Sequence, residues 1–481
     1  MNLPMIVSIL GQVLLVEAGL MVLPMGVSLI YEESCAGAFA ITAAILLAVS
    51  LLARLIRPKH RVFYAREGFV IVALSWVLLS AFGALPFWIS GEIPHYVDCF
   101  FETVSGFTTT GASILANVET LSQGMLFWRS FTHWVGGMGV LVFVLAIVPM
   151  AGDHSMHLMR AEVPGPSVGK LVPKIRLTAK ILYQIYMAMT LLQVVLLCLG
   201  GMSLFDALIT AFGTAGTGGF SNRAASIGAW SSSYIHWVVT IFMILFGINF
   251  NLFYLLCLKK CRQALKSEEL RWYLLIILAA VVMITIDILP RYAHVSTAVR
   301  DASFQVSSII TTTGFATTDF NLWPEFSKAI LVLLMFVGAC AGSTGGGIKV
   351  GRLIILIKSA RREIRRMLHP RAVSAVHLEG KQVDDETLHS ANAYLIVYML
   401  LLLLSILLVS LNGMGFESTA TSVITCFNNV GPGLGLVGPT GNFAGCSALS
   451  KLVLSLDMLL GRLEIFPMLM LVAPGVWKKN G

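Results

Sequence analysis

Apolar runs of about 20 residues recur along the chain, and short polar turns separate them. A run of this length crosses the hydrocarbon core of a bilayer as a helix, because lipid offers backbone polar groups no other partner. The pattern predicts ten full spans, at residues 6–30, 36–53, 68–90, 124–149, 180–201, 233–258, 272–290, 326–357, 391–411 and 449–475. We therefore predict an all-α membrane protein with both termini on one side.

Four shorter apolar pieces lie between these spans, near 98–110, 206–216, 301–312 and 417–428. Pieces of about 10–14 residues are too short to span and are typical of re-entrant segments. Each begins at an acidic residue and runs into a loop rich in Thr, Gly or Asn. The acids are Asp98, Asp206, Asp301 and Glu417. A glycine follows thirteen residues later in the first three pieces and fourteen later in the fourth, at Gly111, Gly219, Gly314 and Gly431.

The repeating unit is therefore span, half-helix, loop, span, used four times after two extra spans. The predicted division is 1–60 for the two-span preface, 61–165, 166–265 and 266–375 for the first three repeats, and 376–481 for the fourth. We expect each acid to cap its half-helix at the positive end of the dipole. The partially negative end then points toward the bilayer centre, which favours a cation. Loop carbonyls from four repeats around one axis would replace the hydration shell of an alkali ion, as in a potassium filter.

Composition and charge agree with this picture. Apolar residues make up 57% of the chain and charged residues only 12%, against roughly 25% charged in soluble domains. Most of the Lys and Arg behind the net charge of +8 fall in segments 54–66, 151–180, 259–271 and 349–381 and in the tail Lys478–Lys479. Basic residues are retained in the cytoplasm, so the excess places both termini there and indicates topology in a lipid bilayer, not nucleic-acid binding.

The span 326–357 contains the run GACAGSTGGGIK from Gly338 to Lys349. Its glycines would break the helix and leave an irregular segment, which we interpret as a gate; the alternative is a packing kink of small residues. The run lacks the Gly-Lys-Ser/Thr of a nucleotide P-loop. The letters Gly433-Leu-Gly435-Leu-Val-Gly438 match a dinucleotide fingerprint but follow no strand, so we predict no nucleotide site on this chain.

Arg462 lies in the middle of the last span, where an arginine is costly and usually functional. The competing interpretation is a structural ion pair with Asp457 or Glu464.

Six strings in order carry a family resemblance: SGFTTTGAS at 105–113, GINFNL at 247–252, SSIITTTGFATTDF at 307–320, CAGSTGGGIKV at 340–350, NNVGPGLG at 428–435 and LGRLEIF at 460–466. Over essentially its whole length the chain resembles the Trk/Ktr/HKT potassium transporter superfamily, and within it the bacterial Trk-type membrane subunit. This resemblance implies potassium uptake as the function, K+ as the transported ion, and the bacterial inner membrane as the location. It also implies a homodimer and a cytosolic regulatory ring that binds NAD or ATP.

The resemblance assigns roles to individual residues. The implied filter residues are Thr109, Thr110, Gly111, Thr217, Gly218, Gly219, Thr312, Thr313, Gly314, Asn429, Val430 and Gly431. The implied gate residues are Gly338, Gly342, Ser343, Thr344, Gly345, Gly346, Gly347 and Lys349. Arg462 would set a charge barrier just below the filter.

Two alternatives stay open. A sodium-tolerant or proton-coupled symporter of the same fold is the first, because the fourth loop is rich in asparagine and Arg223 stands near the outer mouth of the second. The filter loops contain no titratable carboxylate of the kind a proton-coupled carrier needs. The second is a membrane-embedded enzyme or a purely structural assembly factor. The spans show no catalytic constellation, so we predict that the chain is not an enzyme.

Overall fold

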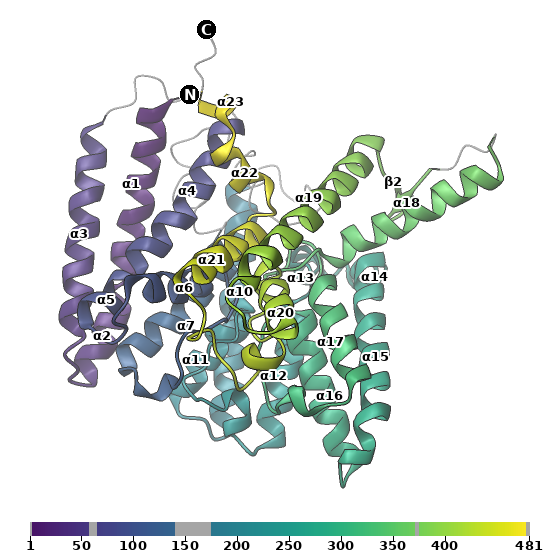
Figure 1. Cartoon of the computed structure of the whole chain (residues 1–481), viewed down its shortest axis with the longest axis horizontal. Coiled ribbons are helices and arrows are strands. Elements are labelled where there is room, and N and C mark those ends of the chain that lie inside the picture. The colour runs from purple at the N-terminus through teal and green to yellow at the C-terminus, as the bar shows by residue number, and fades with distance from the viewer. Residues whose placement is uncertain (1, 57–64, 140–174, 371–374, 478–481) are drawn as a thin grey trace.

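The structure is a computed structural model that describes residues 2–56, 65–139, 175–370 and 375–477. Within these residues nearly all regular structure is helical, and the predicted all-α membrane fold is confirmed (Figure 1). The exception is a small antiparallel hairpin of β1 (His377–Leu378) and β2 (Lys381–Gln382). In the described part of the chain, six helical stretches are long and apolar enough to cross a membrane, or seven if one bent pair counts as a span.

The two extra spans stand at one side of the molecule (Figure 1). The first consists of α1 (Leu3–Leu20) and α2 (Val22–Ile30), and the second is α3 (Ala36–Leu55), which packs along α1.

Each repeat then opens with a span. The four opening spans are α4 (Ala65–Gly83) continued by α5 (Leu85–Ser90), α10 (Ile175–Leu199), α15 (Glu268–Ile288) and α19 (Asp385–Ser410).

The predicted short pieces are half-length helices. They are α6 (Tyr96–Phe107), α11 (Leu204–Gly216), α16 (Val295–Ile310) and α20 (Phe416–Phe427). Their last two turns are buried throughout, so each half-helix ends inside the protein.

The closing spans depart from the prediction of ten continuous crossings. Span 233–258 is two helices, α12 (Ser233–Phe246) and α13 (Phe250–Cys257), bent by 93°. Span 326–357 is α17 (Glu325–Val337), an irregular segment, and α18 (Val350–Leu368). Span 449–475 breaks between α21 (Ala448–Arg462) and α22 (Phe466–Val472). Span 124–149 begins as α7 (Gln123–Gly137), and its residues from 140 onward lie outside the described part.

Short helices complete the described chain. They are η1 (Val118–Thr120), η3 (Ser226–Ala229), α14 (Cys261–Leu265), η4 (Leu289–Arg291), η5 (Phe320–Leu322), η6 (Gly435–Val437) and α23 (Pro474–Trp477).

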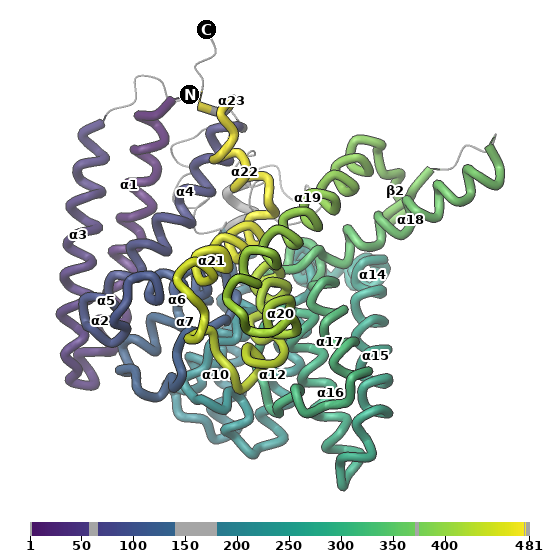
Figure 2. The backbone as a smooth tube through the Cα atoms, in the orientation of Figure 1, coloured from purple at the N-terminus to yellow at the C-terminus, as the bar shows by residue number. Residues whose placement is uncertain are grey.

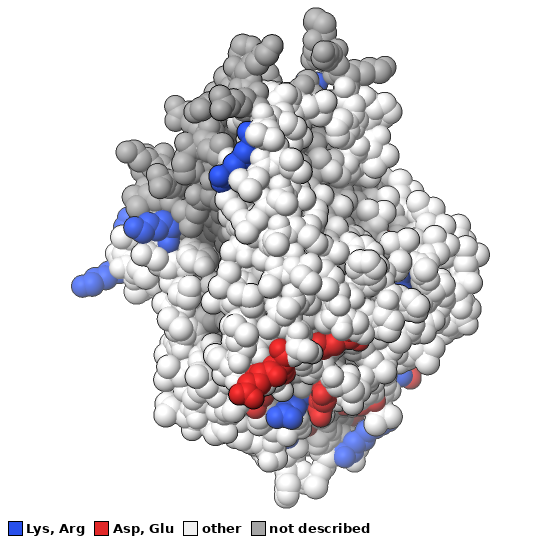
Figure 3. All heavy atoms as spheres, turned by 90° about the vertical axis from the view of Figure 1, so that its left-hand side faces the viewer, with Lys and Arg blue, Asp and Glu red and all other residues white. Residues whose placement is uncertain are grey.

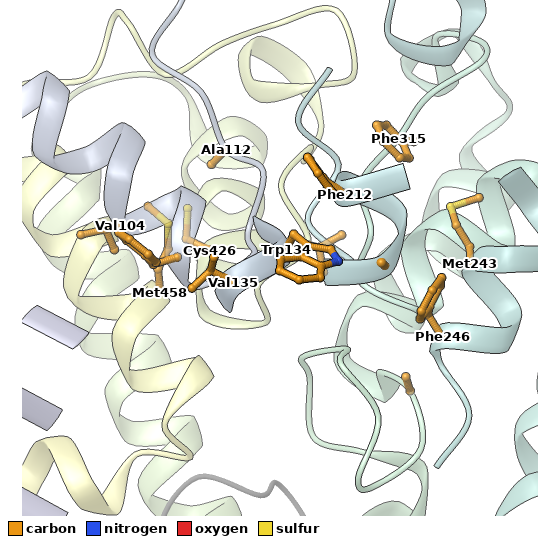
Figure 4. Packing of buried hydrophobic residues seen from close by; sticks show 14 of the residues in the cluster. Val104, Ala112, Trp134, Val135, Phe212, Met243, Phe246, Phe315, Cys426 and Met458 are labelled. Atoms are coloured by element: carbon orange, nitrogen blue, oxygen red, sulfur yellow. The ribbon is translucent and has the colours of Figure 1, made fainter. Parts of the chain in front are cut away.

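The core is continuous across the repeats. Figure 4 shows Trp134 of α7, Phe212 of α11 and Phe246 of α12 on one side of the interior, with Cys426 of α20 and Met458 of α21 on the other. Because a single apolar cluster joins all four repeats, the half-helices that it surrounds are held at fixed positions.

Helix α1 begins and helix α23 ends at the same end of the molecule, as the tube in Figure 2 shows. On the face shown in Figure 3, acidic side chains gather toward the opposite end, and most of the surface between is uncharged. A broad uncharged band between two charged ends is the surface expected of a protein that crosses a bilayer.

Candidate filter and gate

All four half-helices end in the same unusual backbone conformation. A residue one or two positions after each half-helix end is left-handed although it is not glycine: Thr109 has φ 55°, Thr217 55°, Thr312 57° and Asn429 55°. A β-branched residue in this region is strained, and such strain of order 1–3 kcal/mol persists only where the surroundings impose it. Its recurrence at the equivalent position of every repeat indicates a common structural demand.

The left-handed residue is needed to end each half-helix with its last backbone carbonyls hydrogen-bonded. In the first repeat the N–H of Thr109 donates to the carbonyl of Gly106 (3.1 Å) and the N–H of Thr110 to that of Ser105 (2.9 Å). This pair is a Schellman motif, which normally ends in glycine. The same pair closes the other half-helices, from Thr217 and Gly218 to Thr214 and Gly213, from Thr312 and Thr313 to Ile309 and Ser308, and from Asn429 and Val430 to Cys426 and Thr425.

Glycine is required two residues further on. Gly111, Gly219, Gly314 and Gly431 have φ values of 82°, 78°, 82° and 100°, and each lies against the next loop. A Cβ at Gly111 would meet the carbonyl oxygen of Gly218, one at Gly219 that of Thr313, one at Gly314 that of Val430, and one at Gly431 that of Thr110. The contacts run from loop 1 through loops 2, 3 and 4 and return to loop 1, so the four loops form a closed ring.

The ring opens on one side into a cavity of about 400 Å³, which all four of these glycines line. Arg129 and Arg223 also line it. Arg129 is buried and pairs with Glu102 (Nε to Oε1, 2.6 Å) while it stacks 3.5 Å above the ring of Phe220. Arg223 is half-exposed and lies 3.8 Å from Asp206, so its charge at the mouth is partly balanced.

The side chains behind the ring follow two patterns. In loops 1 and 3 a threonine hydroxyl bridges the half-helix to the loop: Thr108 bonds Thr110 and Thr311 bonds Thr313, each at 2.8 Å. In loop 4 the side-chain amide of Asn429 makes the bonds instead, donating to Thr110 Oγ1 (3.0 Å) and to the carbonyl of Met458 (2.9 Å). The asparagine-rich loop therefore joins the last repeat to the first.

The four acids do not cap the half-helices, which corrects the prediction. The residues at the cap positions are His95, Ser203, His294 and Gly415, because each helix begins earlier than its acid. Asp98, Asp206 and Glu417 still lie in the first turn, where their charge favours the helix dipole. Asp301 lies beyond the first turn and pairs with Arg300 (2.9 Å). Asp98 pairs with Lys451 of the fourth repeat (2.6 Å).

The glycine-rich segment between α17 and α18 lies directly under the ring. The N–H of Gly346 donates to Thr312 Oγ1 (2.6 Å), and a Cβ at Gly345 would lie 2.9 Å from the carbonyl oxygen of Thr311. A Cβ at Gly346 would meet the carbonyl of Asn428. The predicted interruption of this span is therefore present, and no side chain fits between it and loops 3 and 4.

The same segment also supplies hydrogen-bond partners to the backbone at the break between α12 and α13 in the second repeat. The N–H of Cys340 donates to the carbonyl of Gly247 and the N–H of Phe250 to that of Gly342, both at 3.0 Å. Irregular backbone at membrane depth needs such partners inside the protein. Gly338, Gly342, Gly347 and Lys349 all have positive φ, so the segment depends on glycine for its path. Ser343 bonds the carbonyl of Cys340 (2.6 Å) and Thr344 that of Phe246 (3.4 Å).

Arg462 fastens this segment to the first repeat. Its guanidinium donates to the carbonyl of Thr344 (2.7 Å) and to those of Gly136 (2.6 Å) and Gly137 (3.2 Å) at the end of α7. Of the two acids considered as its ion-pair partners, Glu464 pairs with Arg352 (2.9 Å) and Asp457 accepts from Ser405 (2.6 Å). The ammonium of Lys349 donates to the carbonyl of Gly345 within the segment.

Several contributing residues were not predicted. Thr108, Thr311, Glu102 and Arg129 support the ring, and His133 stacks on Phe220 at 4.1 Å behind loop 2. The threonines carry a signal, since they precede the left-handed residue in the two TTTG strings. The buried pair of Glu102 and Arg129 comes from two different helices, and no local pattern marks it.

Comparison with known proteins decides the family. The family model for TrkH, described as cation transport protein, matches residues 36–479. This chain belongs to the TrkH family. The TrkH-family relatives include the Trk system potassium uptake protein TrkH of Salmonella typhimurium, 38% identical over 98% of this chain and 99% of that protein. The protein of the same name from Halomonas elongata is 36% identical over the full length of both.

The fold agrees as well. The crystal structure of the potassium transporter TrkH from Vibrio parahaemolyticus superposes with a TM-score of 0.88 at 33% identity, covering 99% of this chain and all of that one. The predicted family resemblance is confirmed, and this TrkH-family chain is a membrane transporter and not an enzyme.

Proposed function

We propose that this chain takes up potassium ions across the bacterial inner membrane through the ring of four loops. The observation that carries the proposal is the closed sequence of contacts from Gly111 through Gly219, Gly314 and Gly431, with all four glycines on one cavity. Left-handed residues two positions apart let neighbouring carbonyls face one axis, and carbonyl rings replace the water of an alkali ion. The relatives named as potassium uptake proteins support K+ as the ion.

In this proposal the carbonyls of Thr109–Gly111, Thr217–Gly219, Thr312–Gly314 and Asn429–Gly431 hold the ion. The segment Gly338–Lys349 is the gate on the cytoplasmic side of the filter, and its contacts with Thr312 and Asn428 support that role. Arg462 sets a charge barrier at the same level. The membrane potential, about 2.3 kcal/mol per charge per 100 mV, draws the cation inward. The proposal also keeps the division of the chain into a two-span preface and four repeats, with boundaries after residues 60, 165, 265 and 375.

Both termini and the basic helix α18 are cytoplasmic in this proposal. Their support is that α1 begins and α23 ends at one end of the molecule and that α18 projects from the upper right of the view (Figure 1). Arg361, Arg365 and Arg366 of α18 are exposed. The family resemblance extends the proposal to a homodimer and to a cytosolic, nucleotide-binding regulatory ring.

The test is uptake of 86Rb into potassium-starved cells that express the wild type or Gly314→Ser. A side chain at Gly314 would meet Val430 and would lie 2.9 Å from Cδ of Pro432, so we expect uptake to fall at least tenfold at equal expression. Gly445→Ser is the matched control, because a Cβ there meets nothing within 4 Å. Equal uptake by Gly314→Ser and the control would refute a filter at this loop. Competition by Na+ in the same assay distinguishes strict selectivity from sodium tolerance.

A further inference from the structure

One carboxylate bonds the gate segment near its start and the first turn of α18 just beyond its end. Glu269, in the first turn of α15, accepts the N–H of Ala341 at 2.7 Å and the N–H of Gly351 at 2.9 Å, both on Oε1. These two residues bracket most of the glycine-rich segment. The Glu269 side chain belongs to a residue that is only 9% exposed, so the two bonds are shielded from water. Charge-assisted bonds of this kind are roughly twice as strong as neutral ones.

The carboxylate also completes α18. The first turn of a helix has backbone N–H groups without intrahelical partners, and the cap residue Lys349 makes no side-chain cap bond. Glu269 supplies an acceptor and a negative charge at this N-terminus. A Cβ at Gly351 would lie 2.8 Å from Glu269 Oε1, so only glycine lets α18 approach this closely.

Glu269 is in turn fixed by the cytoplasmic hairpin. Glu379 Oε1 accepts the hydroxyl of Ser267 (2.8 Å) and the N–H of Glu269 (3.1 Å). Glu379 and Gly380 form the two-residue hairpin turn, with φ values of 54° and 74°. Positive φ at both positions is the geometry of a type I′ turn. The tip of the hairpin thus bonds directly to the residue that holds the gate.

Lys358 of α18 strengthens the same unit. Its ammonium donates to the carbonyl of His377 in the hairpin (2.7 Å) and to Glu268 Oε1 (2.5 Å). A cavity of about 530 Å³ lies beside these contacts, and its lining includes Glu269, Glu379, Ala341 and Gly351. The hairpin tip therefore has open space next to it, and a shift of the tip changes the support of Glu269.

We propose that Glu269 is a positioning residue that holds the gate segment in the position seen here, beneath loops 3 and 4, and that the hairpin 377–382 controls this hold. The inference rests on the proposed gate function and adds the device that sets the gate. Loss of the two bonds weakens the hold on the segment at Ala341 and at Gly351 just beyond it, so the occluding position of the segment becomes less populated. The filter carbonyls are untouched, so ion selectivity stays the same.

The experiment uses the full-length chain in proteoliposomes and measures 86Rb influx against Rb+ concentration, with Na+ as competitor. We expect Glu269→Ala to raise the maximal influx roughly tenfold, the shift that one lost bond to a charged group produces. The half-saturating Rb+ concentration and the Rb+/Na+ ratio should not change. Glu269→Gln, which keeps a neutral acceptor, should fall between the wild type and the alanine variant.

Glu379→Asn tests the hairpin separately. An Asn-Gly pair suits a type I′ turn, so the hairpin is retained, while the shorter side chain releases Ser267 and the N–H of Glu269. We expect a raised maximal influx here too. Glu386→Gln is the matched control, since Glu386 is an exposed carboxylate in the first turn of α19.

The outcomes are distinct. Loss of folded protein lowers the maximal influx, whereas release of the gate raises it, so a structural defect does not imitate the expected result. Unchanged or reduced maximal influx in Glu269→Gln and Glu379→Asn, with normal yield, would overturn the inference even if Glu269→Ala does not fold. Gly314→Ser in the same vesicles tests the proposed function itself. If this variant does not reduce influx, the proposed filter is refuted, whereas the proposal that Glu269 holds the gate segment is not tested by that result.

Discussion

Thr312 is the residue at which the ring and the gate segment meet. Its backbone is one of the four left-handed positions, and its hydroxyl accepts the N–H of Gly346 at 2.6 Å. Replacement by valine keeps the shape and removes the acceptor, which leaves a buried N–H without a partner at a cost of about 1–3 kcal/mol. We expect Thr312→Val to raise 86Rb influx several-fold in proteoliposomes, while Thr312→Ser, which keeps the hydroxyl, stays near the wild type. Similar influx for both variants would show that this bond does not hold the gate.

Arg462 is a second residue to test, because substitutions can separate the effect of its charge from the effect of its hydrogen-bond geometry. Its planar guanidinium bonds three carbonyls at once, whereas a lysine has the same charge but not the same fork. If the charge forms the barrier, Arg462→Lys should conduct like the wild type and Arg462→Met should conduct faster by at least tenfold. If bonding to Thr344 alone sets the barrier, both variants should conduct faster. Single-channel current at a fixed voltage in planar bilayers distinguishes the two.

At the scale of elements, the half-helices were predictable and their closure was not. Length and apolarity placed all four within about three residues of their observed bounds, except at the start of α16, because an apolar piece too short to span forms a re-entrant segment. The acids misplaced the helix starts, since Asp301 is the seventh residue of α16. The left-handed threonines gave no local signal, since the ring contacts, and not the preference of threonine, impose that backbone.

Among the breaks in the closing spans, too, one could be predicted from the sequence and another could not. Five glycines marked the break in span 326–357, but the break after Arg462 occurs at Glu464 and Ile465, which have φ values of 55° and 67°. An isoleucine with positive φ is a strong outlier, so tertiary contacts hold it. The ion pair of Glu464 with Arg352 of α18 is one of them (2.9 Å). Pairing between helices more than a hundred residues apart leaves no periodic trace in the sequence.

The bend between α12 and α13 provides a prediction at this scale. A Cβ at Gly247 would meet the hydroxyl of Tyr273 and would lie 2.9 Å from Cγ2 of Thr311. We expect Gly247→Ala to destabilise the protein by about 1–3 kcal/mol, the usual cost of overpacking. Tyr273→Phe removes the nearest atom, so the double variant should recover part of the loss. Unfolding by intrinsic fluorescence in detergent measures this, and strictly additive effects would contradict the contact.

For the whole molecule, the decisive feature is that the last repeat closes on the first. Lys451 pairs with Asp98, Asn429 bonds Thr110, and the N–H of Phe443 donates to the carbonyl of Ser113 at 2.8 Å. The repeat pattern predicted four corresponding loops around one axis. The order around the ring and the contacts that close it required coordinates, because they join residues at opposite ends of the chain.

In the proposed function the ion in the closed ring is a shared ligand of all four repeats, and this gives a prediction about the stability of the whole protein. A ligand that binds only the folded state stabilises it by about 2.7 kcal/mol at a hundred times its dissociation constant. We therefore expect the unfolding temperature in detergent to rise with K+ or Rb+ and to respond far less to choline at equal ionic strength. In Gly314→Ser the dependence on K+ should vanish, while Gly445→Ser should retain it. Equal stabilisation by choline would mean that ionic strength, and not occupation of the ring, holds the repeats together.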